Sequence, residues 1–404
     1  MPGLLKDEEH PFKTIKVKKL HPTFAAEILG VDFQNLSEEQ FSEILAAMAK
    51  YGVCVFRNTG LSDDAHVAFS RRFGELDSTE RYFSNGRKPR YEHYELFDAG
   101  NVTVEPLLLP SSSDSPRSDS HSHNDHQSPS APKLRLLDPE SPGAQANRGN
   151  GLFHCDSSFN PRRASFSLLR AAQLPPPDAA GGDTLFADSR TAAEELPEEI
   201  LVLLEGKGER GGSVLVGAHS MAHSRKLGSP EFFADLDPTR WPMVRHQILQ
   251  RHEQSGRMNL YIGAHLHHIE EATNIDHDHE QEPETTQDEK GAKQQQWQGR
   301  EIRDSWTLVQ KLNAHATQDK YVVTVPWRDA GDLVIWDNRA VMHRAGPGAF
   351  DGKYVRDLRR TTVHDDSSTA WGLNEVGAEF GAFFTPPPPS VTPAAVAVEA
   401  AVAR

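Results

Sequence analysis

A histidine and an aspartate separated by one residue, His154 and Asp156 in GLFHCDSSF, are the strongest local indication of chemistry in this chain. If this segment is a strand, successive side chains point to opposite faces, so His154 and Asp156 project together while Cys155 points away. An imidazole and a carboxylate on one face offer two ligands to a divalent transition metal ion. The pair alone is weak evidence, because the chain has 20 histidines and His-x-Asp also arises by chance. The alternatives are a hydrogen-bonded core histidine and a surface acid.

A third candidate ligand, His343, follows DLVIWDNRAVM, a pattern typical of an apolar strand, a turn and the start of a second strand. Two histidines and one carboxylate form the facial triad of non-haem iron(II) oxygenases, which leaves coordination positions open for a cosubstrate and oxygen. A structural zinc site would instead close its fourth position with another Cys or His. Other histidine clusters lie in polar stretches with no rigid shell to orient ligands, namely His121, His123, His126, His277 and His279. The sequence therefore predicts an iron(II) site made of His154, Asp156 and His343.

Two arginines in VRDLRRTTV, Arg356 and Arg360, are candidates for binding an anion. On a strand they would share one face with Leu358, while Arg359 would point the other way. Arginines on an apolar face are costly to bury without anions, and a guanidinium matches a carboxylate through two parallel hydrogen bonds. A dicarboxylate cosubstrate meets this requirement. The alternative is a solvated basic strand that forms salt bridges within an acidic protein.

These candidates need a scaffold that joins remote segments, and the apolar pattern predicts one rich in strands. Short apolar runs bounded by turn residues are LFHCDSSF, ASFSLLRA, DTLFAD, MNLYIGAHL, YVVTVPWR, DLVIWDN, AVMHRAG and VRDLRRTTVHD, with earlier strands within 12–33 and at YGVCVFRN. Helices are expected after an N-cap at Ser37, with Ile44, Leu45 and Met48 at helical spacing, and over 63–73, 191–204 and 300–316. This balance predicts a mainly β protein, a sandwich or barrel with flanking helices.

Polar, low-complexity segments interrupt this pattern. Residues of about 110–146 and 274–298 are predicted to be disordered insertions, and 386–404 a disordered Pro/Ala tail. The hydrophobic share is 37% and the mean hydropathy is −0.59, which leaves enough apolar sequence for one large core. We therefore expect a single catalytic domain over 12–385.

Charge and cysteine content restrict the class of protein. The net charge is −15, from 43 basic and 58 acidic residues, which argues against a nucleic-acid partner. The two cysteines, Cys54 and Cys155, cannot build a disulfide scaffold and suit a reducing compartment. The chain begins without an apolar leader and holds no apolar run of about 18 residues. We expect a cytoplasmic enzyme of a small-molecule substrate with no membrane association, and a homo-oligomer is left open.

Taken together, the motifs resemble the taurine dioxygenase and 2,4-dichlorophenoxyacetate dioxygenase family of iron(II)- and 2-oxoglutarate-dependent oxygenases. The similarity runs with interruptions from about Ile15 to Asp366, in FSRRFGEL, NGLFHCDSSF, PPPDAAGGDTLFAD, HSMAHSR, LYIGAHLHHIE, GDLVIWDNRAVMHR and LRRTTVHDD. The GGDT motif and the WDNR motif followed by a histidine are together highly specific. The resemblance implies a double-stranded β-helix core, the jelly-roll of the cupins, with helices packed outside.

The resemblance also implies roles for residues of the metal and cosubstrate site. His154, Asp156 and His343 would hold Fe(2+), with O2 as the oxidant and 2-oxoglutarate as cosubstrate. Thr184, in GGDT, resembles the hydroxyl residue that helps bind the C5 carboxylate of 2-oxoglutarate. Arg356 resembles the main partner of that carboxylate.

On the substrate side, Arg360 resembles the arginine that reaches either the C1 end of 2-oxoglutarate or the anionic group of the substrate. Asn150 resembles an asparagine placed near the substrate. Tyr82 occupies the place of a substrate-contacting tyrosine in one relative, although the loop around it differs. His219 and His223, in HSMAHSR, are either pocket residues or core histidines.

The implied activity is hydroxylation of a small, anionic organic substrate, an aryloxy- or alkyl-carboxylate or a sulfonate. It would be coupled to oxidative decarboxylation of 2-oxoglutarate to succinate and CO2. The alternatives left open are a purine (xanthine-type) dioxygenase, a natural-product tailoring oxygenase and a hydroxylase of macromolecules that the insertions recruit. A non-enzymatic alternative is a degenerate cupin-like metal-binding protein, against which the intact set of His154, Asp156, His343, Thr184 and the two arginines weighs.

Overall fold

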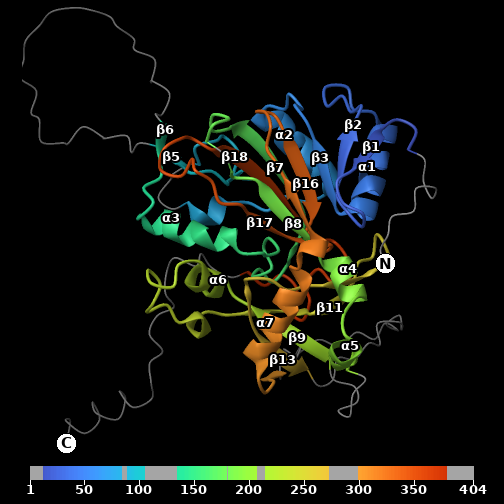
Figure 1. The fold of residues 1–404 in the computed structure, drawn as a ribbon, viewed down its shortest axis with the longest axis vertical. Helices are drawn as coiled ribbons and strands as arrows, with labels where there is room; N and C mark the ends of the chain where they lie inside the picture. The colour runs from blue at the N-terminus through green and yellow to red at the C-terminus, as the bar shows by residue number, and fades with distance from the viewer. Residues whose placement is uncertain are drawn as a thin grey trace, which may run out of the picture.

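The largest element of the fold is a seven-stranded sheet (Figure 1). The computed structural model describes residues 12–83, 89–104, 134–179, 181–206, 214–272 and 299–379. In spatial order the strands of this sheet are β1 (Lys16–Lys19), β2 (Ala26–Leu29), β3 (Val53–Phe56), β16 (Leu333–Asp337), β7 (Ala164–Gln173), β18 (Asp357–His364) and β4 (Phe97–Asp98). Neighbouring strands are antiparallel except β2 and β3, which are parallel.

Smaller sheets complete the β structure. A three-stranded sheet has the order β15 (Val322–Val325), β8 (Thr184–Asp188), β17 (Val341–Ala345). A four-stranded sheet has the order β10 (Val244–Gln247), β9 (Val214–His219), β13 (Leu266–Ala272), β14 (Gly299–Glu301). Two antiparallel pairs are β11 (Leu249–Arg251) with β12 (Met258–Leu260) and β5 (Val102–Val104) with β6 (Leu134–Leu136). In Figure 1 the seven-stranded sheet fills the upper half and β9 and β13 lie in the lower half.

The helices lie around these sheets. They are α1 (Glu38–Tyr51), α2 (Asp63–Ser70), α3 (Pro142–Asn147), α4 (Ser189–Glu194), α5 (Glu198–Leu204), α6 (Met221–Gly228) and α7 (Ser305–Ala316). The Ser37 side chain caps α1 by accepting a hydrogen bond from the Gln40 amide at 3.1 Å, as the sequence predicted. Ile44 and Met48 are buried, but Leu45 is largely exposed, so the apolar face of α1 is narrower than expected.

Strand β3 is buried on both faces, which explains the unbroken apolar run VCVF. Cys54 and Phe56 belong to an apolar cluster shared with α1. Val53 and Val55 belong to a second cluster, to which the three-stranded sheet contributes Phe186, Val325 and Val341. The seven-stranded sheet therefore has helices on one face and the three-stranded sheet on the other.

The structure corrects several expected boundaries. The helix predicted over 191–204 is two helices, α4 and α5, because Pro197 lacks an amide hydrogen and stands at the N-cap of α5. The helix predicted over 300–316 begins only at Ser305, since residues 299–301 pair with β13 as β14. Helix α6, in HSMAHSR, was not among the expected helices.

The predicted insertion of 110–146 is ordered at its C-terminal end. Residues from 134 onward form β6, which pairs with β5, and α3, whose N-cap Ser141 accepts a hydrogen bond from Ala144. The rest of that insertion, the insertion of 274–298 and the tail lie outside the described residues. The mainly β class with flanking helices is confirmed. No helix in the described ranges is both long and apolar enough to cross a bilayer.

Candidate metal centre

The three predicted ligands converge because two remote segments pair at one point. His154 and His343 form an isolated antiparallel bridge, with N–H to O=C distances of 3.0 and 2.9 Å in the two directions. His343 lies within β17, but the His154 segment is not a strand, contrary to prediction. It leaves the bridge at once and turns at Ser157, whose φ is +51°. The turn still buries Cys155 in the core and directs Asp156 towards the two histidines.

The ligand atoms of His154, Asp156 and His343 all lie within 4.8 Å of one another, and they form the group suited to a metal ion within the described residues. Nε2 of His154 is 3.7 Å from Oδ1 of Asp156, and Nε2 of His343 is 3.6 Å from Oδ2. Nδ1 of His154 donates to the Leu152 carbonyl at 2.8 Å, which leaves Nε2 facing the carboxylate. The predicted convergence is confirmed.

Burial and charge prepare these side chains for a cation. Burial opposes ionisation of Asp156, but the Arg360 guanidinium holds the pKa of this carboxyl well below its usual range. Burial also holds the pKa of His343 well below its usual value, which keeps the imidazole neutral, the form that binds metals. Nδ1 of His343 is buried with no hydrogen-bond partner among the described residues. The corner therefore offers an ionised carboxylate at Asp156 and a neutral imidazole at His343.

Arg360 lies at this corner. Its NH1 donates to Oδ1 of Asp156 at 2.5 Å, whereas its Nε is buried and has no partner in the part of the chain that the structure describes. Arg359 points away and bonds Asp357 and Asp63, as strand alternation predicted. The sequence predicted that Arg360 binds 2-oxoglutarate or the anionic group of the substrate. In the structure it binds the carboxylate of Asp156, a predicted metal ligand.

Arg356 precedes β18 instead of lying in it, a correction of the predicted strand. Its amide donates to Oδ1 of Asn101 at 2.8 Å, and the β18 register is irregular between Asp357 and Leu358. Its NH2 donates to the Gly182 carbonyl at 2.6 Å, which brings it to the GGDT motif. Among the described residues no carboxylate forms an ion pair with it, and burial lowers its pKa to about 10.

Thr184 is the first residue of β8 and lies two residues after Gly182, whose carbonyl binds Arg356. Its Oγ accepts a hydrogen bond from Nε1 of Trp327 at 3.2 Å. Since an indole N–H can only donate, the hydroxyl proton of Thr184 remains available to an acceptor. Gly182 cannot carry a side chain, because a Cβ there would lie 2.6 Å from Phe350 and 2.9 Å from Nε of Arg356.

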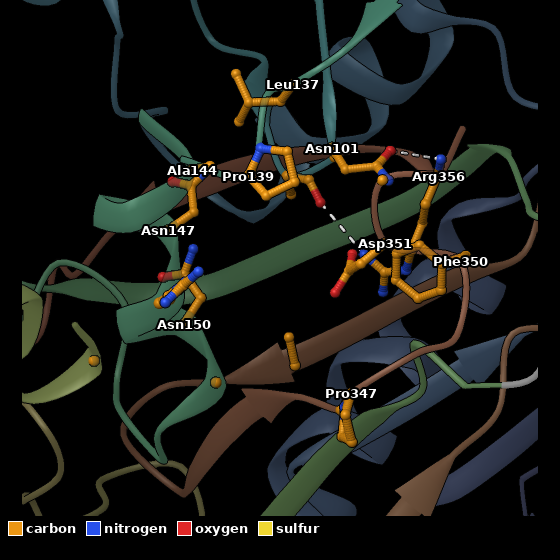
Figure 2. Close-up of a pocket in the computed structure, with 18 of the residues that line it drawn as sticks. Asn101, Leu137, Pro139, Ala144, Asn147, Asn150, Pro347, Phe350, Asp351 and Arg356 are labelled. Carbon is orange, nitrogen blue, oxygen red and sulfur yellow. Dashed lines mark hydrogen bonds between the residues drawn. The ribbon is translucent and has the colours of Figure 1, made fainter. Parts of the chain in front are cut away.

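A cavity of about 660 Å³, here called the Arg356 cavity, opens beside these residues. Figure 2 shows Asn147 and Asn150 on one side of it and Phe350, Asp351 and Arg356 on the other. Arg344, which follows His343, also lines it and lies over the Phe153 ring at 5.2 Å. Asn150 is therefore in the cavity wall, and its position near the substrate stays a prediction. The side chain of Tyr82 is outside what the structure describes.

His219 and His223 are core residues, whereas His121, His123, His126, His277 and His279 lie outside the described residues. His219 and His223 are buried, and His219 packs 5.8 Å from His246 and 5.7 Å from Tyr261 between ring centroids. Sequence reasoning missed His265, whose ring lies 5.4 Å from that of His154 and whose Nδ1 contacts the Ser158 hydroxyl at 3.0 Å. It also missed Ser167, whose hydroxyl donates to Oδ2 of Asp156 at 2.7 Å. The motif LYIGAHLHHIE holds the only sequence signal for His265.

Comparisons with known proteins agree with this geometry. Residues 16–362 match the model of the "Taurine catabolism dioxygenase TauD, TfdA family". The chain is 31% identical to the α-ketoglutarate-dependent 2,4-dichlorophenoxyacetate dioxygenase of Burkholderia sp. (strain RASC), over 87% of this chain and 94% of that protein. It is 30% identical to an α-ketoglutarate-dependent sulfate ester dioxygenase of Pseudomonas putida, over 55% of this chain and 62% of that protein. The crystal structure of AAD-2 with Mn(II) and N-oxalylglycine is similar with a TM-score of 0.59 and 27% identity, over 88% and 98% of the two chains.

Proposed function

This chain belongs to the TauD, TfdA family and is an α-ketoglutarate-dependent dioxygenase, and from that premise we propose that it uses iron(II) to hydroxylate an aryloxyalkanoate. α-Ketoglutarate is 2-oxoglutarate, the cosubstrate that the sequence indicated. The observation that carries the proposal is the convergence of His154, Asp156 and His343 beside Arg360, with Arg356 nearby at the GGDT motif.

His154, Asp156 and His343 would hold the metal. Two imidazoles and one carboxylate suit iron(II), and the described residues add no fourth His, Cys, Asp or Glu to the group. The absence of a fourth side chain favours an open site over a closed structural zinc site. Bound iron would supply the activation of O2, with 2-oxoglutarate converted to succinate and CO2 while the substrate is hydroxylated.

Arg356 and Thr184 are proposed to bind the C5 carboxylate of 2-oxoglutarate. Arg356 is 8% exposed and its guanidinium donates to the backbone carbonyls of Gly182 and Ala99. The charges of Asp351 and Asp183 offset only part of the cost of burying this guanidinium, so a bound carboxylate would stabilise it further. The free hydroxyl proton of Thr184 gives the same carboxylate a second donor.

Arg360 is proposed to attract the anionic group of the substrate. One edge of its guanidinium is occupied by Asp156, but the buried Nε has no partner among the described residues. A substrate anion placed there would satisfy Nε and would hold the substrate beside the metal ligands. This role favours an anionic substrate over a neutral purine ring.

The Arg356 cavity would take 2-oxoglutarate at Arg356 and the outer part of an aryloxyalkanoate, since Arg360 and the metal ligands are not among its lining residues. Leu137, Pro139 and Phe350 offer apolar contact to a ring, whereas Asn150 and Arg344 offer polar groups. Cavities of this size commonly hold a small ligand between mostly apolar walls and a few polar groups. The 2,4-dichlorophenoxyacetate relative acts on a substrate of this class. A contribution from Tyr82 remains part of the proposal.

The test measures succinate formation with iron(II) and 2-oxoglutarate in the presence of 2,4-dichlorophenoxyacetate, an alkyl sulfate ester, an alkyl sulfonate or xanthine. We expect the aryloxyacetate to stimulate succinate formation and to be consumed in equal amount, and xanthine to have no effect. Stimulation by the sulfate ester alone would contradict the aryloxyalkanoate assignment, and stimulation by xanthine alone would contradict an anionic substrate.

Two substitutions separate the two anion sites. Arg356→Gln is expected to raise the KM for 2-oxoglutarate about tenfold or more, since truncating a buried charge pair costs about 2 kcal/mol or more. Arg360→Gln is expected to raise the KM for the aryloxyacetate instead. Each variant is the control for the other, and a shared change in both KM values would contradict the separate roles.

We also infer that the seven-stranded and three-stranded sheets belong to a double-stranded β-helix. Support comes from the apolar cluster they share and from the antiparallel pairing of β8 with β17. The single domain over 12–385, the cytoplasmic location and the absence of nucleic-acid partners stay predictions.

A further inference from the structure

The amide of Asn338, in the WDNR motif, is fully buried and hydrogen-bonded on every side. Its Oδ1 accepts from the Asp156 backbone amide at 2.9 Å and from Nε1 of Trp336 at 3.1 Å. Its Nδ2 donates to the Ser165 carbonyl at 3.2 Å and to the Ser167 hydroxyl at 3.0 Å. One side chain thus joins the Asp156 turn, β7 and β16.

The bond to Ser167 fixes the direction of a proton. Because Nδ2 of Asn338 can only donate, Oγ of Ser167 must accept there. The single hydroxyl proton of Ser167 is then directed to Oδ2 of Asp156, at 2.7 Å. Asn338 therefore acts on Asp156 twice, directly through the backbone amide and through Ser167 on the carboxylate.

Through its bond to Trp336, Asn338 also affects the orientation of a second metal ligand, His343. The Trp336 ring lies 4.5 Å from the His343 ring between centroids, and Phe186 stacks at 6.2 Å. Nδ1 of His343 has no hydrogen bond to any described residue, so ring packing sets the orientation of this imidazole. By holding the indole, Asn338 helps to hold His343.

We propose that Asn338 and Ser167 are positioning residues that orient Asp156 and His343 for metal binding, an inference that rests on the metal site of the proposed function. Arg360 also bonds the Asp156 carboxylate, but it is a long, partly exposed side chain that can leave for an anion. Ser167 is fully buried on a central strand and cannot leave. Groups that orient metal ligands through hydrogen bonds typically contribute 10- to 100-fold to metal affinity.

The test is calorimetric titration of the metal-free protein with Mn(II), comparing wild type, Ser167→Ala, Ser165→Ala and Ser167→Thr. Ser165 is the matched control, because it is also buried on β7 but its hydroxyl donates to the backbone carbonyls of Val363 and His364. We expect Ser167→Ala to raise the Mn(II) Kd about 10- to 100-fold and Ser165→Ala to leave it within about twofold. Ser167→Thr, which keeps the hydroxyl, should restore tight binding.

A spectrum distinguishes positioning from general destabilisation. The absorption bands of Co(II) bound to Ser167→Ala should shift relative to wild type, and those of Ser165→Ala should not. Equal Mn(II) affinities and equal Co(II) spectra for the two alanine variants would overturn the positioning role while leaving the metal site in place. If His343→Ala binds Mn(II) as tightly as wild type, the triad is not the metal site and the proposed function falls with this inference.

Discussion

Two charged regions meet at the WDNR motif: Asp337 belongs to one, and Asn338 binds Asp156 of the other. They differ in how completely their polar groups are paired. In the first, which we call the ion network, Asp337 accepts hydrogen bonds from Arg339 and His252, and Asp365 accepts from Arg339 and Arg163. In the second, the metal corner, Nδ1 of His343 and Nε of Arg360 have no partner among the described residues. The ion network and the three metal ligands are almost inaccessible to solvent, whereas the Arg360 side chain is partly exposed.

Between these two regions, the pairing of the arginine side chains, and not the presence of buried charge, is what differs: Arg339 bonds two carboxylates, whereas Nε of Arg360 has no partner among the described residues. Burial opposes ionisation of both aspartates. Even so, Arg339 holds the pKa of Asp337 far below its usual range, and Arg360 does the same for Asp156. The direction of the pKa shift is therefore the same in both regions. A buried polar atom without a partner costs roughly 1–3 kcal/mol, and the buried Nε of Arg360 is such an atom beside three converging metal-ligand side chains.

The sharpest way to break this comparison is to remove a ligand from the metal corner. His343→Ala should lower succinate formation about 10³-fold or more, because losing one metal ligand removes several kcal/mol of transition-state stabilisation. Its free energy of unfolding in urea, measured on metal-free protein, should fall by no more than about 2 kcal/mol, the cost of the cavity left behind. Retained activity would show that the metal lies elsewhere.

The complementary experiment removes one positive charge from the ion network. Arg339→Met should lower the free energy of unfolding by about 3–5 kcal/mol, because Asp337 and Asp365 would each lose a buried counter-charge. Urea unfolding of metal-free protein measures the change. Arg344→Met is the matched control, since Arg344 is half-buried and forms no ion pair with any described residue, and it should change stability by less than about 0.5 kcal/mol. Equal stability of the two variants would contradict a structural role for the ion network.

The sequence predicted the metal corner better than it predicted the surroundings. Residue type and spacing pointed to His154, Asp156, His343 and Arg356, whereas Thr184 came from the resemblance of GGDT to the family motif. Ser167 could not be selected, because ASFSLLRA offers Ser165 and Ser167 with the same alternation. Only the register that pairs Ser167 with Trp336 on one side and Thr362 on the other decides which hydroxyl meets Asp156.

Errors in the expected elements have equally local causes. The metal-ligand segment was expected to be a strand, but a tertiary hydrogen bond from the Asp156 amide to Oδ1 of Asn338 takes the place of a ladder bond. Helical spacing continues across Pro197, so the apolar pattern missed the break between α4 and α5. Periodicity records burial, whereas turns and breaks depend on partners that lie far away in the sequence.

The smallest expected effect comes from His246, an incompletely paired residue beside the ion network. Its Nδ1 has no partner among the described residues, and burial, aided by the Arg163 charge, lowers its pKa to about 3. Below about pH 6.5 the unfolded chain binds a proton at this residue and the folded state does not. The free energy of unfolding is therefore unaffected by His246 above that pH and falls as the pH is lowered towards 3. Between pH 6.5 and 5.5 the loss from this one group is about 1 kcal/mol. His246→Gln, which cannot titrate, should flatten the fall in unfolding free energy over that interval and run parallel to wild type above pH 7.5. An unchanged slope would mean that His246 finds a partner for its proton inside the fold, and that the ion network extends to it.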